Sequence, residues 1–118
     1  LEMVGQEAKA HCPSLLMADI SNFEEGIRAA ELGFDLVSTT LSGYVGDSTE
    51  TPKGPDLDLV ERLSQHLEDS APVVAEGRIS TPDQATEAIN RGAFCVVVGT
   101  AITRPQTLTQ DFCKGMSK

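Results

Sequence analysis

The sequence predicts an α/β fold in which short parallel strands alternate with amphipathic helices. Two apolar runs rich in β-branched residues, at 71–78 and 93–104, support this prediction. Each run stops at a glycine beside a charged or hydroxyl side chain, as a buried parallel strand does when its C-terminal end carries functional groups. Hydrophobic residues make up 40% of the chain and aromatic residues only 4%, so Val, Ile, Leu and Ala must form most of the core.

The first strand and helix are indicated near the start of the chain. A short apolar run at 15–18 ends at Asp19, which predicts a strand followed by a loop. Ser21 and Glu24 have the spacing of a capping box, so a helix is expected to begin there. Gly33 supplies the left-handed residue that ends this helix.

The second strand is expected at 34–40. The stretch that follows, 41–55, holds too many glycines and prolines for regular structure, and loops of this length in compact domains are often functional. Asp56 can cap the next helix. Its apolar stripe consists of Leu57, Val60, Leu63 and Leu67.

The third strand, within 71–78, leads into a helix with Pro82 in its first turn. Either Ser80 or Thr81 can cap this helix, and the sequence leaves both open. Gly92 ends it. The side chains expected to face inward are Ala85, Ala88 and Ile89.

A fourth strand at 93–98 and a last helix at 105–116 complete the pattern. The pair Ile20-Ser21 recurs as Ile79-Ser80, and Gly33 recurs as Gly92 at the same offset, so the repeated unit is two strand-helix pairs. Four successive βα units imply right-handed crossovers and a parallel sheet. A complete (β/α)₈ barrel usually has about 250 residues, so this chain corresponds to about half of a TIM barrel.

The chain length fits one domain. We expect residues 1–118 to form a single partial TIM-barrel domain of four βα units. Residues 1–11 read as the end of a helix, which indicates that the chain begins partway through a larger fold.

Charge and composition argue against several classes of partner. The formal net charge of −9 disfavours nucleic acid, because it repels phosphate backbones. No apolar stretch reaches the roughly 18 residues of a membrane span, so no membrane partner is expected. The odd number of cysteines, without paired spacing, indicates a reducing cytoplasmic location. These cysteines are Cys12, Cys95 and Cys113.

Glu76 is the candidate acid/base residue. It directly follows the apolar residues 73–75, so its carboxylate is expected at the end of a buried strand, where water is scarce. Gly77 allows a ligand to approach the backbone. The alternative is that Glu76 only forms a salt bridge, for example to Arg78.

The end of the fourth strand is the candidate anion site. Gly99 lets a ligand approach the backbone, Thr100 and Thr103 offer hydroxyl groups, and Arg104 adds positive charge that suits a phosphate. Phosphate sites recur at the last two strands of such barrels. In the alternative interpretation, Gly99 and Thr100 only turn the chain and Arg104 is solvated.

Other polar residues are weaker candidates. Asp19 and Tyr44 lie at expected strand ends or in the loop after one. Two histidines are isolated in the sequence, and a surface role is expected for His66. No spacing assembles a metal site from the remaining acidic residues, and no nucleotide fingerprint is present. These residues are His11, His66, Asp47, Glu50, Asp56 and Asp58.

Five segments, in order along the chain, closely resemble the C-terminal half of the N-acetylmannosamine-6-phosphate 2-epimerase family. The resemblance extends over nearly the whole chain, and the shared register of these segments makes them far more specific than any one alone. They are 38–44 (STTLSGY), 54–57 (GPDL), 74–78 (VAEGR), 81–85 (TPDQA) and 98–104 (VGTAITR).

The resemblance implies a barrel of the ribulose-phosphate-binding type that interconverts N-acetylmannosamine 6-phosphate and N-acetylglucosamine 6-phosphate, without metal or redox cofactor. It places Glu76 in the position of a catalytic glutamate. Gly77 and Arg78 lie beside it, and Gly99, Thr100 and Arg104 match the phosphate-binding end. Asp19 also matches an acidic position of the family.

The family also uses a lysine on an early strand, and none of the lysines of this sequence occupies that position. We therefore expect these 118 residues alone to bind phosphate weakly and not to epimerise. Two other functions stay open. One is a non-catalytic half-barrel that self-associates into a homo-oligomer through its open sheet edges. The other is a different phosphate-binding barrel isomerase.

Overall fold

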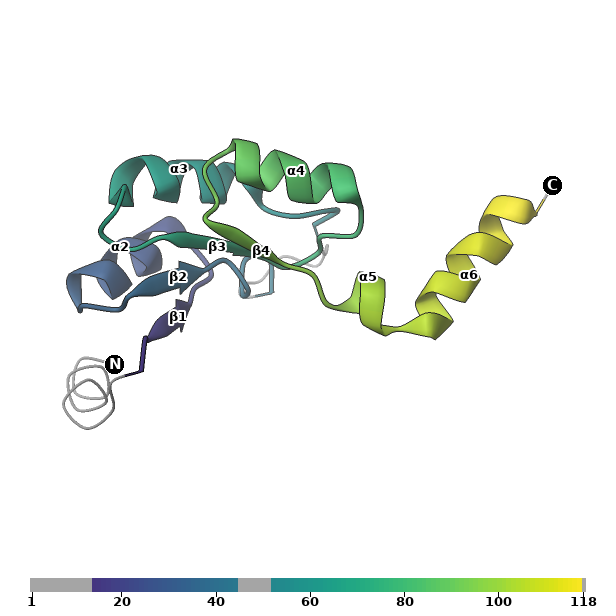
Figure 1. Ribbon diagram of the computed structural model, residues 1–118, viewed down its shortest axis with the longest axis horizontal. Coiled ribbons are helices and arrows are strands. Elements are labelled where there is room, and N and C mark those ends of the chain that lie inside the picture. Colours follow the sequence, from purple (N-terminus) through teal and green to yellow (C-terminus); the bar gives the residue numbers. More distant parts are fainter. Residues whose placement is uncertain (1–13, 45–51, 118) are drawn as a thin grey trace.

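The computed structural model describes residues 14–44 and 52–117 (Figure 1). Four strands form one sheet: β1 (Met17–Asp19), β2 (Leu36–Ser38), β3 (Val73–Glu76) and β4 (Cys95–Val97). The strands are parallel and lie in the order β1-β2-β3-β4, so each strand pairs with the next one along the chain. This confirms the predicted succession of parallel βα units.

Five helices accompany these strands within the described residues. They are α2 (Phe23–Glu31), α3 (Leu57–Leu67), α4 (Pro82–Asn90), α5 (Thr100–Thr103) and α6 (Pro105–Met116). Helices α2, α3 and α4 follow β1, β2 and β3, and each packs against its neighbour in the series. Helix α6 follows the short helix α5 and extends away from the sheet (Figure 1). No described helix combines the length and the apolar character needed to cross a membrane.

The hydrophobic core lies between the sheet and helices α2 to α4. Val37 of β2 and Leu63 of α3 are fully buried, and Val60 and Val73 are nearly so. Helix α2 approaches α3 closely at Gly26, where an added Cβ atom would lie 2.5 Å from Leu63 Cδ2. The buried core consists of Ala, Val, Leu and Ile side chains, as the low aromatic content predicts.

The opposite face of the sheet is less covered. Met17 of β1 and Val97 of β4 are 46% and 40% exposed. No described strand pairs with the outer edge of β1 or of β4. Helix α6 also exposes apolar side chains at helical spacing, namely Leu108, Phe112 and Met116. The described part of the chain thus has the architecture of an open half-barrel.

The first helix begins one residue later than the sequence predicts. Asn22 is the N-cap, and its Oδ1 atom accepts a hydrogen bond from the backbone N–H of Glu25 at 2.9 Å. The carboxylate of Glu25 in turn accepts bonds from the backbone N–H and the hydroxyl of Ser21. The predicted box of Ser21 and Glu24 is therefore wrong, because Asn22 is the cap and Glu25, not Glu24, binds back to Ser21.

Other helix starts agree with the sequence or resolve its alternatives. Asp56 caps α3 by accepting from Leu59 N–H at 3.0 Å. Thr81, not Ser80, caps α4. Ile89 is 48% exposed, so the expectation that it faces inward is wrong. Ala88, expected on the same face of α4, is fully buried.

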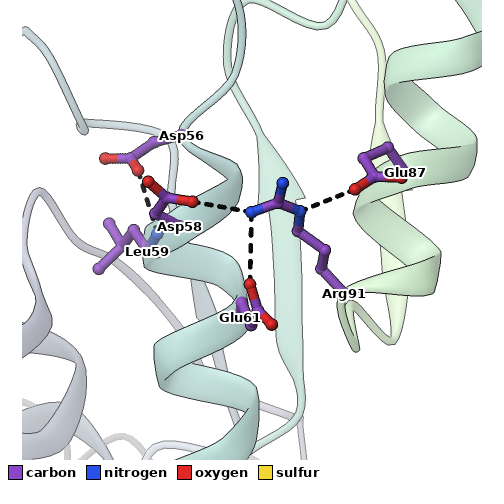
Figure 2. Close-up of polar contacts among 6 residues, drawn as sticks. All are labelled: Asp56, Asp58, Leu59, Glu61, Glu87 and Arg91. Atoms are coloured by element: carbon purple, nitrogen blue, oxygen red, sulfur yellow. Dashed lines mark hydrogen bonds and ion pairs between the residues drawn. The ribbon is translucent and has the colours of Figure 1, made fainter.

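A cluster around Arg91 connects α3 to α4 (Figure 2). The guanidinium of Arg91 binds Glu87 of its own helix at 2.9 Å and reaches Asp58 and Glu61 of α3 at 2.7 and 3.3 Å. These acidic neighbours raise the pKa of Arg91, and the hydrogen bond to Glu87 contributes most. Arg91 therefore links α3 and α4 by ion pairs at the protein surface, in addition to their buried apolar contacts.

Candidate functional site

The C-terminal ends of β3 and β4 open onto one cavity of about 570 Å³. The sheet register pairs Glu76 of β3 with Val97 of β4. Gly99 follows Val97 by two residues, so the two predicted sites leave the sheet side by side. The cavity is lined by Glu76, Gly77, Arg78, Gly99 and Thr100, together with residues of the β2 end, of the α3 approach and of α6.

Hydroxyl groups from the end of β2 hold Glu76. Its Oε2 atom accepts hydrogen bonds from Thr40 Oγ1 at 2.7 Å and from Ser38 Oγ at 3.0 Å. The Thr39 hydroxyl binds the backbone of Glu76, donating to its carbonyl and accepting from its N–H. Three consecutive hydroxyl residues therefore fix both the main chain and the carboxylate of Glu76.

Arg78 is directed to the loop between β2 and α3 and not to Glu76. Its Nε atom donates to the carbonyl of Gly54 at 2.7 Å, and Nη1 donates to the carbonyl of Ser42. The guanidinium lies 5.2 Å from the ring centre of Tyr44. The structure therefore does not contain the salt bridge between Glu76 and Arg78 that the sequence left open.

Two glycines shape the floor of the cavity in different ways. Gly77 has a φ of 106°, which favours glycine, and its position lies against the carbonyls of Thr39 and Thr40. At Gly99, an added Cβ atom would meet nothing within 4 Å. The backbone of Gly99 is therefore open to a ligand, as the sequence predicts for an anion site.

Arg104 lies apart from the other predicted site residues. It is exposed, precedes α6 as its N-cap residue and does not line the cavity. Thr103 donates its hydroxyl to the carbonyl of Gly99 at 2.9 Å and so supports the turn after β4. The phosphate-binding role of Arg104 stays a prediction.

The sequence places functional groups at the end of β2 but does not show what the hydroxyl groups there bind. Ser38 and Thr40 bind Glu76, and Thr40 Oγ1 also lies 3.4 Å from Asp19 Oδ1 of β1. The run Ser38-Thr39-Thr40 after a buried valine was the available signal. Its partners depend on strand pairing, which the sequence does not give.

The remaining candidates in the described part of the chain take part in packing, helix capping or ion pairs. His66 is exposed and packs edge-on against Phe23, with ring centres 5.5 Å apart. Asp56 is a cap and Asp58 pairs with Arg91. Within 14–44 and 52–117, no group of three or more His, Cys, Asp or Glu could hold a metal ion. Three other candidates, His11, Asp47 and Glu50, lie outside the described residues, as does Cys12.

Comparison with known proteins identifies relatives over nearly the whole chain. The profile of the family described as "Putative N-acetylmannosamine-6-phosphate epimerase" matches residues 1–118. A "Putative N-acetylmannosamine-6-phosphate 2-epimerase" of Caldanaerobacter subterraneus subsp. tengcongensis is 57% identical over 98 residues, covering 83% of this chain and 40% of that protein. A protein of the same name from Clostridioides difficile is 51% identical over 102 residues, covering 86% and 44%.

The solved structures include a member of the same family. The N-acetylmannosamine-6-phosphate 2-epimerase from Clostridium perfringens superposes with a TM-score of 0.85 at 44% identity, over 98% of this chain and 48% of that one. Mandelate oxidase superposes with a TM-score of 0.70 at 18% identity and shares the fold alone. The chain thus spans less than half the length of these relatives, and its expected fold, half of a TIM barrel, is confirmed.

Proposed function

This chain belongs to the N-acetylmannosamine-6-phosphate epimerase family, and we propose that it contributes Glu76 and a phosphate site to an epimerase. The reaction interconverts N-acetylmannosamine 6-phosphate and N-acetylglucosamine 6-phosphate. One observation carries the proposal: Glu76 and the open backbone of Gly99 line the same cavity. A sugar phosphate placed there can present its reacting carbon to the carboxylate and its phosphate to the glycine.

Inversion at C2 needs a proton to be removed next to the C1 carbonyl and returned to the opposite face. Such chemistry requires an acid/base group within hydrogen-bonding distance of the proton and donors for the enolate oxygen. In our proposal Glu76 takes part in this proton transfer. Its carboxylate is half-buried and held by two hydroxyl groups, which supports a fixed orientation toward the substrate.

The phosphate is proposed to bind at the ends of β3 and β4. Backbone N–H groups at Gly77 and Gly99 and the hydroxyl of Thr100 serve as donors. Arg78, which lines the cavity, supplies positive charge there, and Arg104 adds charge from outside the lining, at the start of α6. Local cations are important here because the chain carries a formal net charge of −9, which disfavours anions at long range. Glycine at position 99 leaves the room that a phosphate oxygen needs.

The family resemblance assigns a further proton-transfer group, a lysine, to a strand without counterpart among these 118 residues. We infer that the polypeptide of residues 1–118 binds sugar phosphate weakly by itself and does not epimerise it. The complete reaction then needs the part of the barrel that this chain does not match in its relatives.

Four broader assignments belong to the same proposal. We infer that residues 1–118 act as one partial barrel domain and that the protein works in sialic-acid catabolism in the cytoplasm. We also infer a homo-oligomer, supported by the unpaired edges of β1 and β4 within the described sheet and by the exposed apolar residues of α6. A well-behaved monomer in sedimentation at micromolar concentration would refute the oligomer.

Hydrogen exchange at C2 tests the proposed reaction. Deuterium incorporation into N-acetylmannosamine 6-phosphate is followed by NMR for the chain alone and for a chimera in which it replaces the matching 48% of the C. perfringens protein. We expect exchange by the chimera, its loss in the Glu76→Gln chimera, and none by the chain alone. Glu68→Gln, at an exposed position that ends α3, is the matched control. Undiminished exchange in the Glu76 variant contradicts the proposal.

A further inference from the structure

We propose that Thr40 is a positioning residue for Glu76, and that its hydroxyl hydrogen turns between Glu76 and Asp19 as Glu76 changes charge. This inference rests on the proposed function, because it assumes that Glu76 gains and loses a proton during the reaction. It goes beyond the hydrogen bond from Thr40 to Glu76 by giving the hydroxyl hydrogen of Thr40 a second position, toward Asp19.

The sheet register brings the three side chains together. Asp19 of β1 pairs with Ser38 of β2, and Ser38 pairs with Val74 of β3. Thr40 and Glu76 each follow these paired positions by two residues, so they emerge next to one another at the strand ends. The oxygen of Thr40 lies 2.7 Å from Glu76 Oε2 and 3.4 Å from Asp19 Oδ1.

Ser38 completes the arrangement from the buried side. Its oxygen lies 2.6 Å from Thr40 Oγ1 and 3.0 Å from Glu76 Oε2, and the residue is fully buried. The two hydroxyl groups thus have four short contacts between them, one to each other, two to Glu76 and one to Asp19. Each hydroxyl carries a single hydrogen, so the four contacts cannot all be hydrogen bonds at the same time.

When Glu76 is charged, the two shortest contacts can both hold a hydrogen. Thr40 donates to Glu76 Oε2, and the hydrogen of Ser38 is shared between Thr40 Oγ1 at 2.6 Å and Glu76 Oε2 at 3.0 Å. When Glu76 carries a proton on Oε2, that proton is donated to Thr40 Oγ1. The oxygen of Thr40 then accepts from both Glu76 and Ser38, and its own hydrogen turns to Asp19 Oδ1, which is an acceptor when ionised.

Only one O–H group rotates between the two arrangements. No covalent bond changes, and the extra proton is the one that Glu76 exchanges with the substrate in the proposed reaction. Glu76 Oε2 keeps a hydrogen-bonding partner in both charge states. A polar group held in this way needs little reorganisation during proton transfer, which is how preorganised sites accelerate reactions.

Replacements of Thr40 test this inference in the chimera that carries the full chain. Thr40→Val keeps the shape and removes the hydroxyl, and we expect kcat to fall about 10- to 100-fold, the cost of losing a hydrogen bond to a charged group, with KM changed less than about twofold. Thr40→Ser restores the hydroxyl and is expected to recover kcat to within about threefold. Thr86→Val, at an exposed position of α4, is the control.

The outcomes separate this inference from the proposed function. If the unaltered chimera shows no C2 exchange, the proposed function fails. If it exchanges and Thr40→Val matches it, Thr40 does not assist Glu76. If Thr40→Val and Thr40→Ser are equally slow, the residue acts through packing and the inference is overturned. If the Thr40→Val chimera does not fold, Thr40→Ala is measured in its place and compared with Thr40→Ser in the same way.

Discussion

The Nε atom of Arg78 donates a hydrogen bond to the carbonyl oxygen of Gly54 at 2.7 Å. The same guanidinium binds the carbonyl of Ser42, so one side chain from the β3–α4 loop joins both ends of the connection between β2 and α3. Tyr44, in contact with Arg78, and Gly54 both line the cavity. The wall of the candidate site therefore depends on Arg78, whether or not Arg78 also touches a ligand.

Arg78→Ala should destabilise the protein by about 2 kcal/mol, because two carbonyl groups lose a charged donor. Arg78 has a φ of 56°, a left-handed conformation that costs about 1 kcal/mol for a residue other than glycine. Arg78→Gly should therefore be less harmful than Arg78→Ala. Urea unfolding of the three proteins measures both differences, and equal stability of Arg78→Ala and the unaltered chain would refute the role of Arg78 in holding the loop.

Gly99→Ala separates folding from binding. The added methyl group meets nothing within 4 Å, so the melting temperature should change by less than about 2 °C. The methyl group occupies the room proposed for a phosphate oxygen, so affinity for inorganic phosphate should fall at least about tenfold, a loss of about 1.4 kcal/mol. Calorimetric titration of phosphate, compared with Gly115→Ala as control, checks this. Unchanged affinity would place the anion elsewhere.

Arg91→Ala should lower the melting temperature, since it removes the ion pairs that link α4 to Asp58 and Glu61 of α3. The difference from the unaltered chain should shrink as salt rises from about 0.05 to 1 M, because screening weakens exposed ion pairs. The pKa of Arg91 is raised in the folded state, so its contribution is fully present below the ordinary arginine pKa and is lost only as pH rises through the raised value. Lys114→Ala, which removes a 3.8 Å surface pair, is the control.

Two glycines in helices should respond in opposite directions to alanine. Gly26→Ala places a methyl group 2.5 Å from Leu63 Cδ2 in the core, and we expect a loss of about 1 to 3 kcal/mol from overpacking. Gly115→Ala meets nothing within 4 Å in α6, and alanine should gain about 0.5 to 1 kcal/mol through helix propensity. Denaturant unfolding measures both, and a stabilised Gly26→Ala protein would contradict the close packing of α2 on α3.

Local signals in the sequence were sufficient for the succession of elements. Helix α6 covers 105–116 as predicted, because a proline at the first helical position marks its start. Gly33 and Gly92 end their helices with φ values of 84° and 101°, as expected of left-handed stops. The start of α2 was misplaced by one residue because Ser21 and Asn22 are both good caps and each has a glutamate three residues later.

The contacts of the candidate site could be predicted only in part. Glu76 and Gly99 reach one cavity because strand ends in a parallel sheet share one rim, a rule that needs no register. The bonds from Ser38 and Thr40 to Glu76 require the β2–β3 register, which no local pattern specifies. The side chain of Arg78 binds the carbonyls of Gly54 and Ser42, which no local sequence pattern specifies, and its role toward a phosphate stays a prediction.

The most direct test of the account is whether one ligand occupies both ends of the cavity. In an amide NMR titration of the isotopically labelled chain, inorganic phosphate should shift the signals of Gly99 and Thr100 and leave Glu76 unchanged. N-acetylmannosamine 6-phosphate should shift all three with a single dissociation constant, and Gly99→Ala should weaken all three together. Signals of Glu76 and Gly99 that respond to the sugar phosphate with different dissociation constants, or Glu76 signals that never respond, would contradict a shared site.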